Sequence, residues 1–100
     1  MADGQSCLKE RTFVRIQEPK KYNVVFHNDD FTSMEFVVMV LMSVFRHTEA
    51  SAQTLMMNVH KEGKAIVGTY SYDIAMSKTL KAKQMAREQG FPLNITVEEA

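Results

Sequence analysis

Four side chains in this sequence carry the acceptors and titratable groups that catalysis or ligand binding requires: Asn28, Asp29, Asp30 and His60. Two carboxylates and an imidazole can serve as acid, base or metal ligands in an enzyme. In proteins without such a site, an Asn-Asp-Asp run is typical of a turn before a helix, and a histidine near a helix end is typical of a group that interacts with the helix dipole. The elements that position these residues therefore decide what they can do.

The residues around the polar run predict a strand before it and a helix after it. Residues 22–27 alternate over a β-branched and aromatic stretch, which is typical of a strand, and the polar run ends that strand. Thr32 and Glu35 have the spacing of a capping box, which predicts a helix start. Six apolar residues at a 3.6-residue period are expected to face inward from this helix: Met34, Val37, Val38, Leu41, Val44 and Phe45.

Two further helices and two further strands are predicted downstream. Thr48 can cap a second helix, and Gly63 is a natural C-terminal stop for it. Residues 64–70 then have the composition of a strand, and residues 93–98 alternate as a last strand. Ser71 can cap a third helix between these two strands, with inward residues expected at Ile74, Ala75, Ala82, Met85 and Ala86.

Length, composition and element order fit one small domain with an arm at its N-terminus. The chain has 100 residues and 45% hydrophobic content, so residues 22–100 are predicted to form a single core. The order strand, helix, helix, strand, helix, strand predicts an α+β fold with a three-stranded antiparallel sheet and three helices packed on one face. Residues 1–21 mix charges with scattered apolar side chains and are predicted to be a flexible arm.

Charge and cysteine content narrow the function classes. Twelve basic side chains balance twelve acidic ones, so neither nucleic acid nor a membrane surface is expected as a partner. Cys7 is the single cysteine and has no intramolecular partner, which favours a reducing, cytoplasmic location. His27 and His47 show no metal-ligand spacing with each other or with Cys7, so neither a metal nor another cofactor is expected.

The polar run belongs to a longer segment that resembles a known family. Residues 28–38, Asn-Asp-Asp-Phe-Thr-Ser-Met-Glu-Phe-Val-Val, are similar to the N-D-D-Y-T-P-M-E-F-V segment of ClpS adaptors, with Ser33 in place of the usual proline. Residues 59–65 resemble the family's V-H-x-x-G-K-A block, and residues 90–93 resemble its late H-P-L turn. The resemblance runs from residue 22 to residue 97 and covers nearly all of the predicted domain.

This resemblance implies a site that binds the N-terminal residue of another protein. It implies that Asn28, Asp29 and His60 contact the free α-amino group of that residue. It further implies a wall around the first side chain, made by Asp30, Thr32, Met34, Val37, Met56, Val59 and Leu93.

The function implied is that of an adaptor, not an enzyme. The adaptor captures proteins with a large hydrophobic N-terminal residue (Leu, Phe, Tyr or Trp) and delivers them to the N-terminal domain of a ClpA- or ClpC-like AAA+ ATPase for degradation. The arm before Tyr22, which in the family engages the Clp ATPase, matches no recognisable motif.

The chemistry of the implied site agrees with these residue types. A free N-terminal ammonium has a positive charge and three donors, whereas an internal peptide nitrogen has no charge and one donor. A carboxylate, an amide oxygen and a neutral imidazole nitrogen can all accept hydrogen bonds from the ammonium. Met56, Val59 and His60 share one side of the predicted second helix, and Met34 adds a flexible, polarizable side chain to the apolar wall.

Two other functions are compatible with parts of the pattern. One is a domain that docks to a Clp ATPase and modulates it without recognising N-terminal residues. The other is an enzyme that uses Asp29, Asp30 and His60, but the sequence contains no nucleophile elbow, phosphate loop or paired metal motif.

The predicted first helix is apolar almost all round. It carries four apolar residues outside its inward stripe, Phe36, Met39, Val40 and Met42. A helix of this kind must cover its second face, so weak self-association or another partner is expected at Met39 and Met42.

Overall fold

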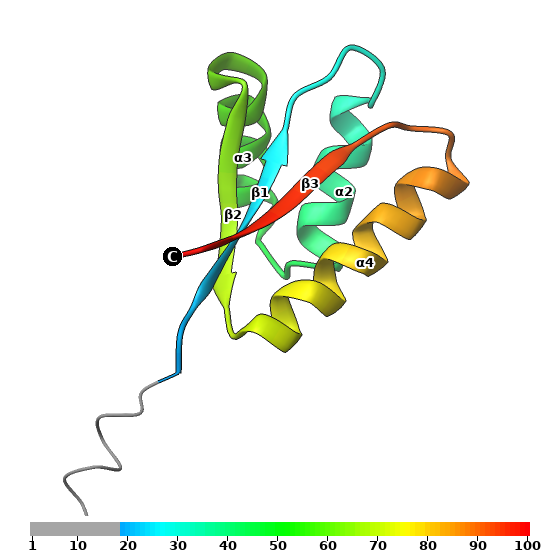
Figure 1. Cartoon of the computed structure of the whole chain (residues 1–100). Helices are drawn as coiled ribbons and strands as arrows, with labels where there is room; N and C mark the ends of the chain where they lie inside the picture. The colour runs from blue at the N-terminus through cyan, green and yellow to red at the C-terminus, as the bar shows by residue number, and fades with distance from the viewer. Residues whose placement is uncertain (1–18) are drawn as a thin grey trace, which may run out of the picture.

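The structure is a computed structural model that describes residues 19–100. Its elements are β1 (Tyr22–His27), α2 (Met34–Ser43), α3 (Glu49–Glu62), β2 (Lys64–Tyr70), α4 (Tyr72–Glu88) and β3 (Asn94–Glu99) (Figure 1). These elements have the types and the order that the sequence predicts. The predicted flexible arm, residues 1–21, lies outside the described residues except for its last three, and Cys7 lies outside them as well.

The three strands form one antiparallel sheet in the order β2-β1-β3. At one end of this sheet, His27 of β1 pairs with Lys64 of β2 and Asn94 of β3. The loop that follows β1 and the first residue of β2 therefore lie at the same end of the sheet. The C-terminal end of α3 lies there too, because β2 follows α3 directly. At the other end, the carbonyl of Lys21 accepts a 2.9 Å hydrogen bond from the backbone nitrogen of Ala100, so strand-like contacts begin one residue before the predicted boundary.

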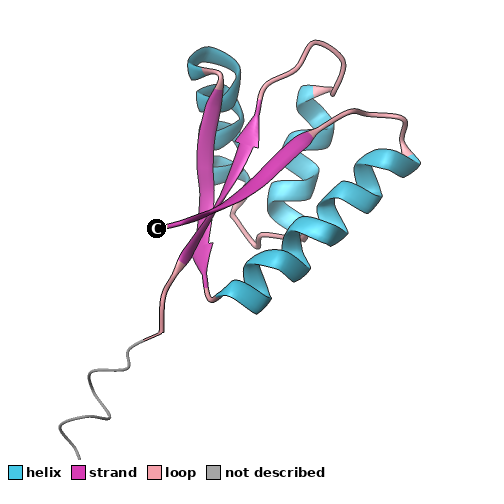
Figure 2. Ribbon diagram, viewed as in Figure 1, coloured by secondary structure: helices cyan, strands magenta, loops and turns pink. Residues whose placement is uncertain are grey.

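The helices cover one face of the sheet (Figure 2). Val24 and Phe26 of β1 point toward the helices and are fully buried in one core with Leu41 of α2 and Ile95 of β3. Apolar burial of this kind contributes most of the favourable free energy of folding. The predicted α+β architecture, with a three-stranded antiparallel sheet and helices on one face, is confirmed.

The start of α2 differs from the prediction. Ser33 is the N-cap residue, and its Oγ accepts a 3.1 Å hydrogen bond from the backbone nitrogen of Phe36. The predicted capping box of Thr32 and Glu35 is wrong, because the hydroxyl of Thr32 donates to the carboxylate of Asp29 at 2.8 Å instead. A carboxylate is the stronger acceptor, so it recruits Thr32 and leaves the next hydroxyl to cap the helix.

The inward face of α2 is wider than predicted and shifted. Val40 is fully buried and Phe36 is buried, whereas Met34, which was expected to face the core, is 44% exposed. Val38 is half-buried at the edge of the core. The reason is that α2 has neighbours on two sides, since it packs against α3 and its Phe36 ring lies 5.1 Å from the ring of Phe91. The prediction holds for the other four residues, Val37, Leu41, Val44 and Phe45.

α4 lies on the sheet through small side chains. Ala75, Ala82 and Ala86 are buried as predicted, while Ile74 is exposed and the inward position one turn further on belongs to Thr79. Lys78 joins α4 to the end of α2, because its Nζ donates a 2.8 Å hydrogen bond to the carbonyl of Val44. No helix in the range 19–100 is long and apolar enough to cross a membrane.

Candidate functional site

The loop between β1 and α2 is organised by the carboxylate of Asp29. Its Oδ1 accepts hydrogen bonds from the backbone nitrogens of Phe31 and Thr32, at 2.8 and 2.7 Å. Its Oδ2 accepts a 2.8 Å hydrogen bond from the hydroxyl of Thr32. Short side-chain to backbone bonds of this type replace regular secondary structure in turns. They hold the loop in one conformation and fix the carboxylate at the end of β1.

These bonds also set the charge of Asp29. Partial burial by itself would raise the pKa of its carboxyl, but the hydrogen bonds from Thr32 and Phe31 outweigh burial and hold the pKa below its ordinary value of 3.8. Hydrogen bonds donated to the charged form stabilise it. Asp29 therefore supplies a fixed negative charge at neutral pH.

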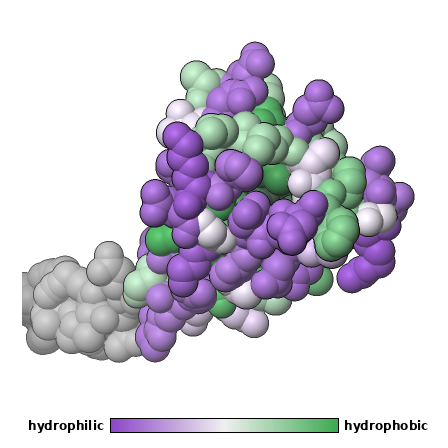
Figure 3. Space-filling model, turned by 90° about the horizontal axis from the view of Figure 1, so that it is seen from above, coloured by the Kyte–Doolittle hydropathy of each residue, from purple (hydrophilic) through white to green (hydrophobic). Residues whose placement is uncertain are grey.

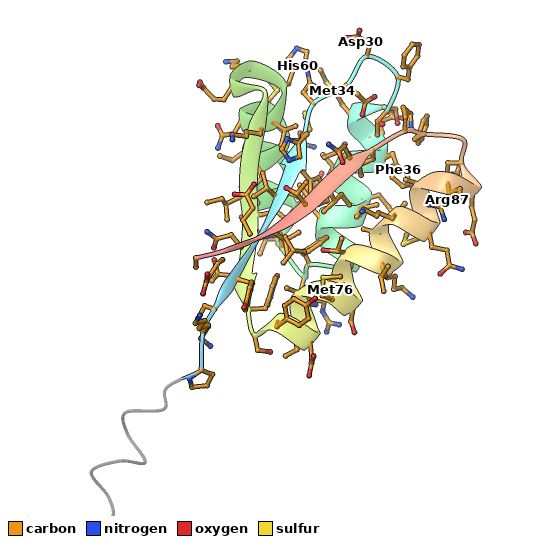
Figure 4. All side chains as sticks on the ribbon, viewed as in Figure 1. Asp30, Met34, Phe36, His60, Met76 and Arg87 are labelled. Carbon is orange, nitrogen blue, oxygen red and sulfur yellow. The ribbon has the colours of Figure 1, made fainter. Side chains whose placement is uncertain are left out.

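His60 reaches the same end of the molecule from the last turn of α3. Gly63 ends that helix in a left-handed conformation with φ of 89°, which glycine adopts without strain. The backbone nitrogen of Asn28 donates a 2.8 Å hydrogen bond to the carbonyl of Gly63 and so ties the loop to this helix end. Figure 4 shows His60, Asp30 and Met34 together at this end of the ribbon.

A cavity of about 250 Å³ opens between the loop and the two helices. Its lining combines polar side chains from the loop and the end of α3 with apolar side chains from the facing sides of α2 and α3: Asn28, Asp29, Asp30, Thr32, Met34, Val37, Met56 and His60. Figure 3 looks onto this end of the molecule and shows hydrophobic surface bordered by hydrophilic side chains. The cavity therefore offers acceptors at its rim and apolar contact at its wall.

The structure brings most of the predicted site residues together. Of the ten, three for the α-amino group and seven for the wall, eight line this cavity. Val59 and Leu93 do not line it. Both are buried in the core, and Leu93 borders a separate hollow beside Lys83 and Arg87 of α4. The roles assigned to all ten residues stay predictions.

Sequence reasoning missed two features of this end of the molecule. The first is that Asp29 accepts hydrogen bonds from Thr32 within its own loop. The signal for this in the sequence is an aspartate three residues before a threonine. The second is a neighbouring cavity that includes Glu35, Val38 and Gln53, which no sequence pattern indicated. Among the described residues, no group of three or more His, Cys, Asp and Glu side chains is placed to hold a metal ion.

Fold and cavity together define a small α+β domain that carries a surface cavity with a polar rim and an apolar wall. The family model for the ATP-dependent Clp protease adaptor protein ClpS matches residues 17–96. The chain belongs to the ClpS family, which is a family of Clp protease adaptors and not of catalytic proteins.

Individual relatives agree with this assignment over nearly the whole chain. The ClpS adapter of Desulforapulum autotrophicum is 42% identical over 103 residues, which cover 99% of both chains. That of Acetivibrio thermocellus is 45% identical over 94 residues, which cover 94% of this chain and 95% of the relative. Among solved structures, Agrobacterium tumefaciens ClpS2 bound to L-phenylalaninamide is similar with a TM-score of 0.80 and 42% identity, and the match covers 83% of this chain and 100% of that one.

Proposed function

We propose that this chain binds substrate proteins by a free N-terminal large hydrophobic residue (Leu, Phe, Tyr or Trp) and delivers them to a Clp AAA+ ATPase for degradation. The observation that carries the proposal is the cavity, in which an ionised carboxylate lies at the rim above apolar side chains. The ligand of the similar Agrobacterium protein supports it. L-Phenylalaninamide has a free α-amino group, an aromatic side chain and a neutral amide that stands in for the first peptide bond.

The polar rim suits a cationic chain end. Asn28 offers an amide oxygen and His60, when neutral, a ring nitrogen, while Asp29 provides the negative charge. A hydrogen bond with one charged partner contributes roughly 1.5 to 3 kcal/mol. An acetylated N-terminus has no positive charge and only one donor, so it loses most of this contribution.

The apolar wall suits an aromatic side chain or an aliphatic one that is not branched at Cβ. Met34, Val37 and Met56 line it, and Met34 is flexible and partly exposed, so it can adjust to side chains of different shape. Burial of a Leu or Phe side chain contributes roughly 1.5 to 3 kcal/mol before ordering costs. Two or three hydrogen bonds at the rim and this burial together contribute roughly 4.5 to 12 kcal/mol before ordering costs, a range that includes the about 8 kcal/mol of micromolar binding.

The first test compares peptides that differ only at residue one: Leu, Phe, Val and N-acetyl-Phe. We expect the Leu and Phe peptides to bind with micromolar affinity or better by isothermal titration calorimetry. The Val and N-acetyl-Phe peptides should bind at least about tenfold more weakly, a loss of about 1.4 kcal/mol. Equal affinity for all four would contradict the proposal and favour a domain that modulates a Clp ATPase without recognising N-terminal residues.

Matched variants locate the binding to the cavity. Asp29→Asn removes the negative charge but keeps the oxygen that accepts from Phe31 and Thr32, and His60→Ala removes the imidazole. Each should weaken the Phe peptide about tenfold or more. Lys61→Ala is the control, because Lys61 is exposed and adjoins His60 without lining the cavity. Unchanged binding in both cavity variants would place the site elsewhere.

Delivery is the second half of the proposal. The expected partner is the N-terminal domain of a ClpA- or ClpC-like ATPase, and the family assignment supports it. Degradation of a reporter with an N-terminal Phe by the ATPase and its peptidase should depend on this chain, and the free Phe peptide should compete. We also propose that the protein is cytoplasmic and that it self-associates weakly through Met39 and Met42.

A further inference from the structure

A second cavity lies directly against the first. It has a volume of about 210 Å³ and is lined by Met34, Glu35, Val38, Gln53 and Met56. Met34 and Met56 line the first cavity as well, so these two side chains form the wall between the two spaces. Two adjacent valines of α2 line different cavities: Val37 lines the first and Val38 lines the second.

Two cavities that share Met34 and Met56 can be reached in turn by one extended peptide. In an extended chain, side chains of residues one and three point to the same side and lie roughly 6.5 to 7 Å apart, while that of residue two points the opposite way. A peptide whose first side chain fills the first cavity, and whose chain leaves over Met34 and Met56, therefore places its third side chain at the second cavity. The second side chain points to solvent.

We propose that the second cavity is a subsite for the third residue of the substrate and that it favours lysine or arginine there. This inference rests on the proposed function of the first cavity. Val38 and Met56 provide an apolar surface for the aliphatic stem of such a side chain, and Glu35 provides a carboxylate for its cationic end. Glu35 is exposed, so its carboxylate is accessible to a ligand.

The local charge supports a basic residue over an acidic one. Asp29 and Asp30 line the first cavity and Glu35 lines the second, so each cavity has at least one carboxylate. An acidic third residue meets the like charge of Glu35 in the second cavity, which costs free energy even in partly screened surroundings.

The test uses three peptides of identical composition that begin with Phe and carry one lysine at position two, three or four. Because net charge is the same, long-range attraction to the protein affects all three alike. We expect the position-three peptide to bind about threefold to fivefold more tightly, the range of an exposed ion pair at its upper end. Fluorescence anisotropy of labelled peptides measures these ratios.

Glu35→Gln should remove this preference and leave the affinity of the other two peptides within about twofold. Glu49→Gln is the matched control, because Glu49 is also an acidic residue in the first turn of a helix but lines neither cavity. The control should keep the preference for lysine at position three.

The outcomes separate this inference from the proposed function. If Phe still binds better than Val at residue one while the three lysine peptides bind equally, the subsite is contradicted and the proposed function stands. If Glu35→Gln weakens all three peptides by the same factor, its charge acts at long range and the subsite is also contradicted. If residue one makes no difference in any of the peptides, the proposed function itself fails.

Discussion

At the scale of single residues, the carboxylate of Asp29 has two roles: it stabilises its own loop, and it supplies a negative charge to the cavity. The carboxylate accepts three hydrogen bonds from the loop, two at Oδ1 and one at Oδ2. A carboxylate has about four acceptor positions, so little remains for a ligand besides the negative charge. Asn28 and His60 line the cavity and are more exposed, so we expect them to make the direct contacts with an ammonium group. A substitution of Asp29 therefore affects both the conformation of the loop and the binding of a ligand, unless the new side chain preserves the loop conformation.

Asp29→Asn should make the stability of the domain less dependent on pH. The folded-state pKa of Asp29 is lowered, so its contribution is fully present above the ordinary value of 3.8 and is lost as the pH falls through the lower folded-state pKa. Because the group is partly exposed and screened, we expect the variant to be less stable by only about 1 kcal/mol near pH 7. The difference should be smaller at pH 2 than at pH 7, because it is lost as the pH falls through the folded-state pKa. Urea unfolding at both pH values measures it.

Asp30→Asn is the control for this prediction. It removes the same charge from the next residue, which is exposed and accepts no hydrogen bond from the described part of the chain. Its free energy of unfolding should differ from that of the unchanged protein by less than about 0.5 kcal/mol at either pH. A constant loss in Asp29→Asn from neutral to acidic pH would show that the carboxylate charge does not stabilise the loop.

At the scale of elements, α2 is the helix on which both fold and site depend. Val40 and Leu41 are fully buried in the core, while Met34 and Val37 line the first cavity. The last carbonyl groups of a helix have no partner within the helix. At this end of α2, Lys78 of α4 donates a hydrogen bond to the carbonyl of Val44. Both ends of α2 are therefore fixed by side-chain hydrogen bonds, which keeps the cavity wall in place.

The contact of α4 with the sheet contains a polar group that the structure does not satisfy. Thr79 is 3% exposed, and its hydroxyl has no hydrogen-bond partner in the range 19–100. An unsatisfied buried hydroxyl costs roughly 1 to 3 kcal/mol. Thr79→Val keeps the branched shape and removes the hydroxyl, so we expect the free energy of unfolding to rise by about 1 kcal/mol in urea titrations.

Thr54→Val makes the same chemical change on α3 and serves as the comparison. The hydroxyl of Thr54 is exposed and donates a 3.1 Å hydrogen bond to the carbonyl of Ala50. Its replacement should change the free energy of unfolding by less than about 0.5 kcal/mol. A loss of stability in Thr79→Val would mean that its hydroxyl has a partner in the folded protein.

At the scale of the whole molecule, a net charge of zero conceals an uneven distribution. Asp29, Asp30 and Glu35 gather around the two cavities, whereas Lys83 and Arg87 border a separate hollow along α4. The carboxylates attract a cationic chain end locally, while the balanced total avoids general attraction to polyanions. Local charge can therefore select the ligand even though the molecule as a whole is neutral.

Self-association is the prediction that concerns the whole molecule. Met39 and Met42 are 41% and 39% exposed on the outer side of α2, whereas Phe36 and Val40, predicted to share that face, belong to the core. We expect the protein to form dimers weakly, near about 1 mM, in sedimentation equilibrium, which corresponds to about 4 kcal/mol. The double variant Met39→Gln, Met42→Gln should be monomeric.

Leu80→Gln controls for exposed apolar surface in general. Leu80 lies on α4 and is one of the exposed large hydrophobic side chains of the described range. This variant should associate like the unchanged protein. If the unchanged protein is monomeric at about 1 mM, the methionines are not a dimer contact.

The sequence by itself determined the type and order of the elements. The signals for these elements are local, because each lies within a single turn or strand: the alternation over residues 22–27, the cap at Thr48 and the stop at Gly63. The resemblance to ClpS adaptors then named the site residues, and eight of those ten residues line one cavity.

Only the tertiary structure decided how these residues meet. Asn28 and His60 are far apart in the chain and come together because β1 ends where α3 passes into β2, a junction closed by the bond from Asn28 to Gly63. The exposure of Met34, the burial of Val59 and Leu93, and the second cavity beside Glu35 depend on which faces neighbouring elements cover. Helical periodicity shows that a face is apolar but not which neighbours cover it, so these features follow from packing alone.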